Sequence, residues 1–316
     1  MSMILNEKYV GHKSNFLFYT NRALKIYPIY WVILLLLIIW SVFAYKLGYW
    51  GTLNFYVGNW PLSISTIAYL AVANFFIIGL DWSFLFGLKN GNLYFTKNFN
   101  QTSPKVYNFA FNSIAWTISI ELLFYVIAPF IVRRNLYLVL AFLFLSLMLR
   151  IVLALGGLSF PPWNYMFFPT QLMFFMGGII SYHLYLKMKG MNVNSFILKT
   201  LYTLLICIVL FYYQVFEESY IKQAVLYVSV ILLMPASFII SKNNKFDRFL
   251  GNLSYPIYIS QSLVINITAG KTFPKLFGWG FTSLVIILLV SLLLEQFVNK
   301  PIEKYRQRRM VSPVVV

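Results

Sequence analysis

The sequence predicts an all-α fold, a polytopic transmembrane helical bundle of about eight spans plus one re-entrant or interfacial helix. Hydrophobic residues make up 60% of the 316 residues and charged residues only 10%, with a mean hydropathy of +0.74. Soluble domains contain about 45–50% apolar and about 25% charged residues, so this composition excludes a water-soluble globular protein. The apolar runs are too long for the strands of a membrane barrel and fit helices instead.

The candidate spans are apolar runs, because crossing the hydrocarbon takes about 20 residues of helix. They cover residues 27–46, 63–80, 113–132, 136–155, 166–186, 197–214, 223–241, 255–270 and 278–298. We expect residues 63–80 to form the re-entrant or interfacial helix and the other runs to cross the bilayer. No repeat or long linker divides the chain, so residues 1–316 are predicted to form a single membrane-embedded domain.

Basic residues predict the orientation of these spans. Lysine and arginine total 25 against 8 acidic residues, a net charge of +17, and such an excess marks cytoplasmic loops. If residues 63–80 do not cross, the basic clusters all fall on one side: Lys8–Lys25, Arg133–Arg134, Lys187–Lys199, Lys242–Arg248 and Lys300–Arg309. The sequence therefore predicts a cytoplasmic basic segment at 1–26, an external segment at 47–112 and a cytoplasmic tail at 299–316. Because topology accounts for the charge, no nucleic-acid partner is expected.

Glu121 and Arg150 are ionisable residues inside predicted spans. Such residues are costly in a bilayer, and each is therefore a candidate functional residue. The two lie at similar distances from the turn near Asn135, one before it and one after it. With a helical rise of about 1.5 Å per residue they reach nearly the same depth, and we predict an ion pair between them. The ion pair has two possible roles: it stabilises the helical hairpin, or it forms part of an active site.

Other polar residues in the apolar runs are weaker functional candidates. Glu295 lies near the predicted cytoplasmic end of its run and is expected to be solvated, while His183 is expected to be an interfacial anchor. Gly177 and Gly178 are small residues that allow close packing of helices. No metal ion or tightly bound cofactor is expected. The lone Cys207 excludes an intrachain disulfide.

Four stretches of the chain resemble the acyltransferase 3 family of membrane O-acyltransferases. Residues 115–125 are similar to its signature of a tryptophan, a hydroxyl residue and a glutamate, and residues 250–258 to its late serine–tyrosine stretch. The others resemble a basic entry to a span and the basic exit after the last one. In chain order the stretches are 22–31 (RALKIYPIYW), 115–125 (AWTISIELLFY), 250–258 (LGNLSYPIY) and 300–306 (KPIEKYR).

The resemblance implies acyl transfer across a membrane. Such enzymes take an acyl group, usually acetyl, from cytoplasmic acyl-CoA and deliver it to a hydroxyl of a cell-envelope polysaccharide or glycolipid. We therefore expect a multi-pass protein of a bacterial cytoplasmic (inner) membrane, with both termini cytoplasmic. Acetyl-CoA would be a substrate rather than a bound cofactor, and the partners would be the lipid bilayer and the carbohydrate acceptor.

The resemblance also assigns expected roles to particular residues. Cationic and aromatic groups at the predicted cytoplasmic mouth would bind the phosphates and the rest of the donor: Arg22, Lys25 and Tyr27. The catalytic residues would be Glu121 and Arg150. Aromatic rings that offer stacking faces to a sugar would bind the acceptor: Trp82, Trp116 and Tyr255. Membrane-interface anchoring is the other reading of the tryptophans.

The chain departs from the family pattern at its histidines. Such proteins begin with two spans that this sequence lacks, and the first carries an intramembrane histidine treated as the catalytic base or acyl carrier. His12 and His183 are not at mid-depth, and Gln261 stands where the late motif often has a histidine. Glutamine cannot accept a proton at neutral pH. Because residues 1–8 resemble the end of the family's second span, we hypothesise an upstream gene start or a natural truncation.

Two other functions remain open from the residues. A transporter or flippase for a lipid-linked sugar would suit a bundle with charges at depth and aromatic faces, although no inverted repeat supports it. A truncated, non-catalytic membrane partner derived from the enzyme would suit the missing histidine.

Overall fold

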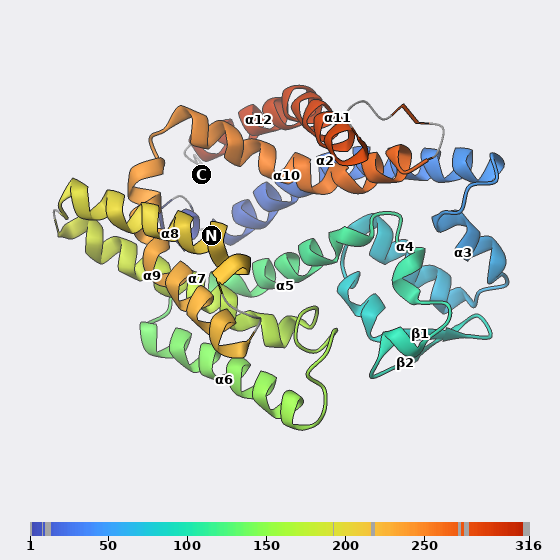
Figure 1. The fold of residues 1–316 in the computed structure, drawn as a ribbon, viewed down its shortest axis with the longest axis horizontal. Coiled ribbons are helices and arrows are strands. Elements are labelled where there is room, and N and C mark those ends of the chain that lie inside the picture. Colours follow the sequence, from blue (N-terminus) through green and yellow to red (C-terminus); the bar gives the residue numbers. More distant parts are fainter. Residues whose placement is uncertain are drawn as a thin grey trace. The chain divides into compact units, whose positions relative to one another are not determined.

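Long helices account for most of the protein (Figure 1). The computed structural model describes residues 2–7, 9, 14–191, 193–215, 219–270, 273–274 and 278–311. The long helices are α2 (Ser14–Lys46), α5 (Trp116–Ile131), α6 (Leu136–Leu155), α7 (Phe168–Gly190), α8 (Ser195–Val215), α9 (Tyr220–Ser241), α10 (Lys245–Thr268), α11 (Trp279–Leu294) and α12 (Lys300–Val311). A π-helical turn, η5 (Glu295–Asn299), joins the last two into one continuous helix.

Short elements precede α2 and fill the segment between α2 and α5. They are the helices α1 (Ser2–Glu7), α3 (Thr52–Gly58) and α4 (Ile64–Phe76), the 3-10 turns η1 (Asp81–Phe84), η2 (Phe99–Gln101), η3 (Val106–Phe109) and η4 (Ser113–Ala115), and the strands β1 (Phe86–Lys89) and β2 (Asn92–Phe95). The strands form one antiparallel hairpin, the only sheet in the described part of the chain.

The chain divides into two compact units. The first comprises Met1–His12, Ile127–Leu149 and Pro169–Gly251. The second comprises Lys13–Val126, Arg150–Phe168 and Asn252–Val316. Each of the helices α5, α6, α7 and α10 contributes residues to both units. The candidate active site described below lies entirely within the second unit.

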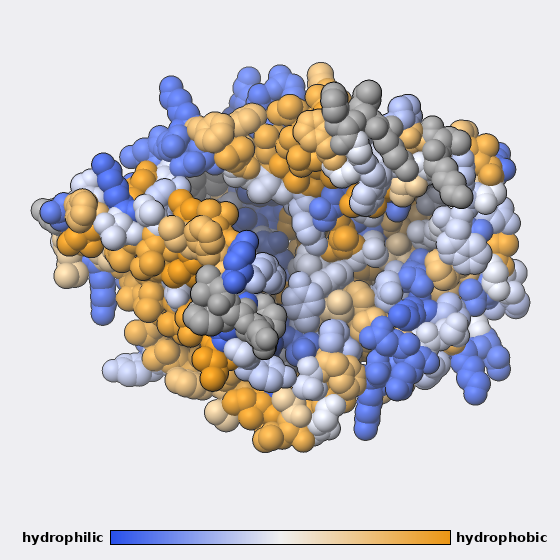
Figure 2. Space-filling view, viewed as in Figure 1, coloured by the Kyte–Doolittle hydropathy of each residue, from blue (hydrophilic) through white to orange (hydrophobic). Residues whose placement is uncertain are grey.

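The helical composition confirms the predicted membrane bundle. Six helical segments of the described chain are long and apolar enough to cross a membrane: Ser14–Lys46, Ser113–Ile131, Leu136–Leu155, Ser195–Gln214, Tyr220–Ser241 and Trp279–Arg309. The predicted spans 166–186 and 255–270 fall in α7 and α10, which have 23 and 24 residues but are less apolar. Exposed hydrophobic side chains cover outward faces of α6, α8 and α11 (Figure 2), as lipid-facing helices require.

Helix α4 is too short to cross a bilayer. Its 13 residues rise about 20 Å, whereas the hydrocarbon core is about 30 Å thick. A helix that ends inside a membrane must find partners for its last carbonyls. Side chains of α2 supply them: the Tyr27 hydroxyl donates to Phe76 O at 2.8 Å, Trp31 Nε1 donates to Phe75 O at 2.9 Å, and the Tyr30 hydroxyl donates to Asn74 O. This capping fits the re-entrant helix predicted for residues 63–80.

A β-hairpin lies in the predicted external segment, where the sequence analysis placed no strand. Its turn is Asn90–Gly91, both with positive φ (49° and 75°), the pair that two-residue hairpins favour. Gly91 has a second reason to be glycine, because a Cβ there would lie 2.5 Å from Pro61 O. The hairpin covers a small core of buried side chains: Leu62, Leu70, Leu88, Val106 and Phe109.

Close helix packing in the first unit depends on one glycine of the predicted pair. A Cβ built on Gly177 would lie 2.6 Å from Cδ1 of Ile231, so α7 and α9 approach closely at this position. This contact confirms the packing role predicted for Gly177. Gly178 points into open space, where a Cβ would meet nothing within 4 Å.

Candidate active site

Three helices of the second unit converge on a cavity of about 370 Å³, which we call the charged cavity. Helix α2 contributes the basic positions of its first half, α5 contributes its signature glutamate, and α10 contributes the late tyrosines. The lining residues are Arg22, Lys25, Ile26, Thr117, Ile118, Glu121, Tyr125, Ser254, Tyr255 and Tyr258. Three of the four stretches that carry the family resemblance therefore meet in one place.

Glu121, Tyr125 and Arg22 form the polar centre of the charged cavity. Glu121 and Tyr125 lie one helical turn apart on α5, and the Tyr125 hydroxyl donates a hydrogen bond to Glu121 Oε1. The Arg22 guanidinium lies over the Tyr125 ring at 5.3 Å and over the Phe18 ring at 5.6 Å. Arg22 is 7% exposed, and its Nε has no hydrogen-bond partner among the described residues. A buried cation with spare donor capacity is suited to an anionic ligand.

Tyrosines of α10 fix that helix against α2 and α5. The Tyr255 hydroxyl donates to Ile26 O at 2.8 Å. Tyr258 Oη lies 2.6 Å from Thr117 Oγ1 and donates to Ile114 O at 2.5 Å. Asn112, which is fully buried, donates from Nδ2 to Ile259 O at 3.1 Å. These contacts join residues more than 140 positions apart and hold the wall of the charged cavity in place.

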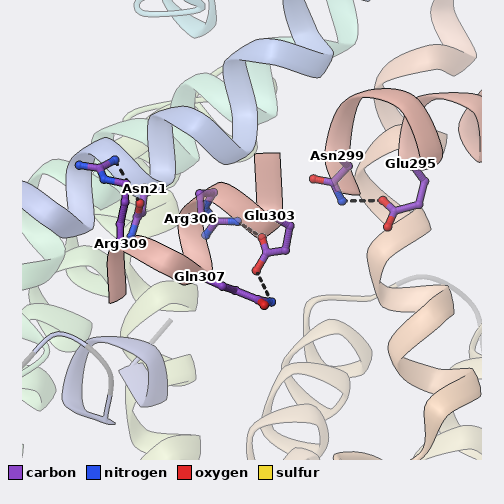
Figure 3. Close-up of polar contacts among 7 residues, drawn as sticks. All are labelled: Asn21, Glu295, Asn299, Glu303, Arg306, Gln307 and Arg309. Carbon is purple, nitrogen blue, oxygen red and sulfur yellow. Dashed lines mark hydrogen bonds and ion pairs between the residues drawn. The ribbon is translucent and has the colours of Figure 1, made fainter. Parts of the chain in front are cut away.

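Helix α12 holds the first half of α2 through Arg309, which reaches Asn21 (Figure 3). Arg309 Nη2 donates to Thr20 Oγ1 at 3.1 Å, and Arg309 Nη1 donates to Asn21 Oδ1 at 3.4 Å. Thr20 and Asn21 directly precede Arg22, so the basic exit after the last span also positions the basic entry of α2. Figure 3 also shows the ion pair of Arg306 with Glu303 on α12.

Comparison with known protein families identifies the family to which the chain belongs. The family described as "Acyltransferase domain" matches residues 2–296 of the chain. The chain belongs to the acyltransferase 3 family. No curated protein and no solved structure matches it. The match includes all residues lining the charged cavity.

The acyltransferase gathers four of the sequence-predicted site residues in the charged cavity. Arg22 and Lys25 were predicted to bind the donor, Glu121 to act in catalysis and Tyr255 to contact the acceptor, and all four line it. Their functional roles stay predictions. The family resemblance singled out these residues, because each lies on a stretch that is similar to the family.

The other predicted site residues lie elsewhere in the second unit. Tyr27 caps α4 through Phe76 O. Trp116 packs edge-on against Tyr165 at 5.2 Å, and Trp82 is 45% exposed on η1. Arg150 is half-buried on α6. None of these four is among the described residues lining the charged cavity, and the Glu121–Arg150 ion pair stays a prediction.

The environment of Glu295 differs from the one expected. Glu295 was expected to be solvated, but it is 4% exposed. Asn299, one turn later in η5, donates from Nδ2 to Glu295 Oε2 (Figure 3). A spacing of four residues places the amide and the carboxylate on the same helix face, within reach of each other. His183 lies on α7 in the first unit, and its role as an interfacial anchor stays a prediction. His12 lies outside the described residues.

Asp81 is a buried carboxylate that the sequence analysis missed. It is 3% exposed, and the Ser119 hydroxyl donates to Asp81 Oδ1 at 2.6 Å. Burial raises the pKa of Asp81 to about 6, against the lowering effect of its hydrogen bonds to Ser119 and to backbone N–H groups. Ser119 belongs to the signature stretch and lies two residues before Glu121. An aspartate within an apolar context is the sequence signal that would have identified it.

Replacing Asp81 by asparagine is expected to change how stability depends on pH. The folded-state pKa is about 6 and the ordinary value 3.8, so ionisation costs folding free energy above about pH 6 and costs nothing below about pH 4. The cost at neutral pH is about 3 kcal/mol, at about 1.4 kcal/mol per pKa unit. Asparagine keeps an acceptor for Ser119 and carries no charge. The Asp81→Asn variant should therefore melt higher than the parent near pH 7.5 and lose most of this advantage near pH 4.5.

Thermal unfolding of both proteins in detergent at the two pH values measures the effect. Asp247→Asn, at the start of α10, serves as the matched control. Parallel melting curves for the parent and Asp81→Asn across this pH range would show that Asp81 ionises in the folded state as it does in water.

Proposed function

We propose that the protein is a membrane-bound O-acyltransferase that moves an acyl group, expected to be acetyl, from cytoplasmic acyl-CoA to a hydroxyl of a cell-envelope polysaccharide or glycolipid. The observation that carries the proposal is the charged cavity, where Glu121, Arg22 and Lys25 line one space. Family membership supports acyl transfer in general. The donor, the acceptor and the bacterial inner membrane are part of the proposal.

The cations of α2 suit an acyl-CoA donor. Coenzyme A carries phosphates, and a buried guanidinium with unused donors binds phosphate more strongly than a solvated one. Arg22 is such a group, held by the rings of Phe18 and Tyr125. Lys25 lies one turn further along the same helix and lines the same cavity. The two cations would bind the donor and hold its thioester near α5.

Glu121 would assist the attacking hydroxyl. In the reaction the acceptor oxygen forms a bond to the acyl carbon, the carbon–sulfur bond of the thioester breaks, and the thiolate of CoA takes up a proton. The hydroxyl must lose its proton as it attacks, and a carboxylate within hydrogen-bond reach accepts it. Glu121 is the one carboxylate among the described residues lining the charged cavity. Tyr125 fixes its orientation through the hydroxyl hydrogen bond.

A transfer assay tests the proposal. The purified chain, reconstituted in liposomes, is given acetyl-CoA labelled in the acetyl group together with O-deacetylated envelope glycan from the source cells. We expect label in the glycan that mild alkali releases, as an ester requires. In a Lys25→Gln variant the KM for acetyl-CoA should rise about tenfold, the loss of one charge-assisted contact. Glycan that crosses the bilayer without acetyl-CoA, and no ester label, would favour the flippase instead.

A further inference from the structure

A second and larger cavity lies in the same unit, which we call the aromatic cavity. Its volume is about 690 Å³, within the range of small-molecule sites. It is formed by the second half of α2, the segment that follows it, the end of η3 and the second half of α10. Aromatic rings provide much of its wall: Trp40, Tyr49, Trp50, Phe55, Tyr107, Phe111 and Phe273.

The polar groups of the aromatic cavity are uncharged. The lining contains two asparagines, Asn108 and Asn266, and the hydroxyl residues Ser41, Thr52, Ser113 and Ser262, and it contains no acidic, basic or histidine side chain among the described residues. The charged cavity differs in this respect, because Arg22, Lys25 and Glu121 line it. A ligand of the aromatic cavity would therefore be neutral, with apolar faces for the rings and hydroxyl groups for the amides.

Several of these polar groups have unused hydrogen-bonding capacity. The side chains of Asn108, Asn266, Ser113 and Ser262 make no hydrogen bond to other described residues. Two amides offer both donors and acceptors, which is what a ring of sugar hydroxyls requires. A site for an alkyl chain would gain nothing from them, since an unpaired amide is costly next to hydrocarbon.

The two cavities are neighbours along the same helices. On the chain entering α5, Ser113 lines the aromatic cavity and Thr117, four residues later, lines the charged cavity. On α10, Tyr258 lines the charged cavity and Ser262, four residues later, lines the aromatic one. Four residues are about one helical turn, or about 6 Å. The contact of Thr117 Oγ1 with Tyr258 Oη at 2.6 Å lies at this junction.

We propose that the aromatic cavity binds a neutral sugar unit of the acceptor and directs one of its hydroxyls past Thr117 and Tyr258 toward Glu121. The inference rests on the proposed acyltransferase function and names the part of the protein that selects the acceptor. It replaces Trp82 and Trp116 as the expected acceptor contacts with Trp50, Asn266 and their neighbours. Acyl-CoA itself is a poor fit to this cavity, because its phosphates would find no cation there.

Two variants with one matched control test the inference. Trp50→Ala removes a stacking face, and Asn266→Leu removes the amide at nearly constant size. Trp279→Ala is the control, since Trp279 is 45% exposed on α11 and does not line the cavity. Binding of a neutral, O-deacetylated envelope oligosaccharide and of CoA is measured on the reconstituted protein. Each variant should weaken oligosaccharide binding about tenfold, the loss of one good contact, with CoA affinity unchanged.

The outcomes separate this inference from the proposed function. A higher acceptor KM in both variants, with donor KM unchanged and Trp279→Ala like the parent, supports the cavity as the acceptor site. Normal oligosaccharide affinity in both variants overturns it, even while acetyl transfer stands. Displacement of the oligosaccharide by a neutral alkane but not by free hexose also overturns it, because the occupant would then be a lipid chain. A parent protein that binds the oligosaccharide but transfers no acetyl group would reject the proposed function alone.

Discussion

The Glu121→Gln variant is expected to lose acyl transfer, with kcat falling about 10²–10⁴-fold, the range for removing a positioned acid–base group. Glutamine has nearly the same shape as glutamate and keeps an oxygen that accepts the hydrogen bond from Tyr125. It cannot take a proton from the attacking hydroxyl. The donor KM should change little, because Arg22 and Lys25 remain in place. Initial rates with labelled acetyl-CoA and saturating acceptor measure the loss.

Two further variants make this result interpretable. Asp247→Asn removes a carboxylate at the start of α10 that does not line the charged cavity, and it should transfer at the parental rate. If Glu121 pairs with Arg150 as predicted, Glu121→Gln also lowers the yield of folded protein, because a lone buried charge is destabilising. Glu121→Gln with Arg150→Gln should then restore the yield without restoring transfer. Normal yield and normal transfer in Glu121→Gln would show that the site is assigned wrongly.

The sequence was sufficient for the fold class because membrane helices are local in sequence. An apolar run of the right length needs no partner to be recognised, and 63–80 was identified as unusual from charge alone. The hairpin at Asn90–Gly91 was also present in the sequence as a strong turn signal between two short strands. The two strands have only four residues each, too few for an alternating pattern to indicate them. Tyr27 was assigned to the donor, since nothing local reveals that its hydroxyl caps a helix 49 positions away.

In the candidate site, contacts within one helix were predictable from the sequence, and contacts between residues far apart in the sequence were not. Glu121 and Tyr125 share one face of α5 at a spacing of four residues, and Arg22 and Lys25 are one turn apart on α2. Each of these two pairs can therefore be predicted from the sequence. Asp81 meets Ser119 across 38 positions, and Tyr258 meets Thr117 across 141. Contacts of this length depend on how helices pack. Sequence spacing alone cannot specify them.

The Tyr30→Phe variant is expected to destabilise the protein by about 1–3 kcal/mol, the cost of leaving a buried polar group without a partner. Tyr30 is fully buried, and its hydroxyl donates to the carbonyl of Asn74 in the last turn of α4. Phenylalanine fills the same space, so the packing is kept and only the hydrogen bond is lost. The last carbonyls of α4 have no partner within the helix, and in the re-entrant placement predicted for residues 63–80 lipid cannot supply one.

Thermal unfolding in detergent, with Tyr45→Phe as the control, would measure this cost. Tyr45 lies on the same helix, is 40% exposed, and its hydroxyl makes no hydrogen bond to the described residues. The control should melt like the parent, whereas Tyr30→Phe should melt about 2–5 °C lower, since about 1 kcal/mol corresponds to about 1–2 °C at an unfolding entropy of about 2.1 cal/mol/K per residue. Adding Trp31→Phe should lower the melting temperature further, because Phe75 O then also loses its donor. Equal melting of Tyr30→Phe and Tyr45→Phe would mean that the end of α4 obtains its hydrogen bonds from elsewhere, and α2 would then serve only as a packing surface for it.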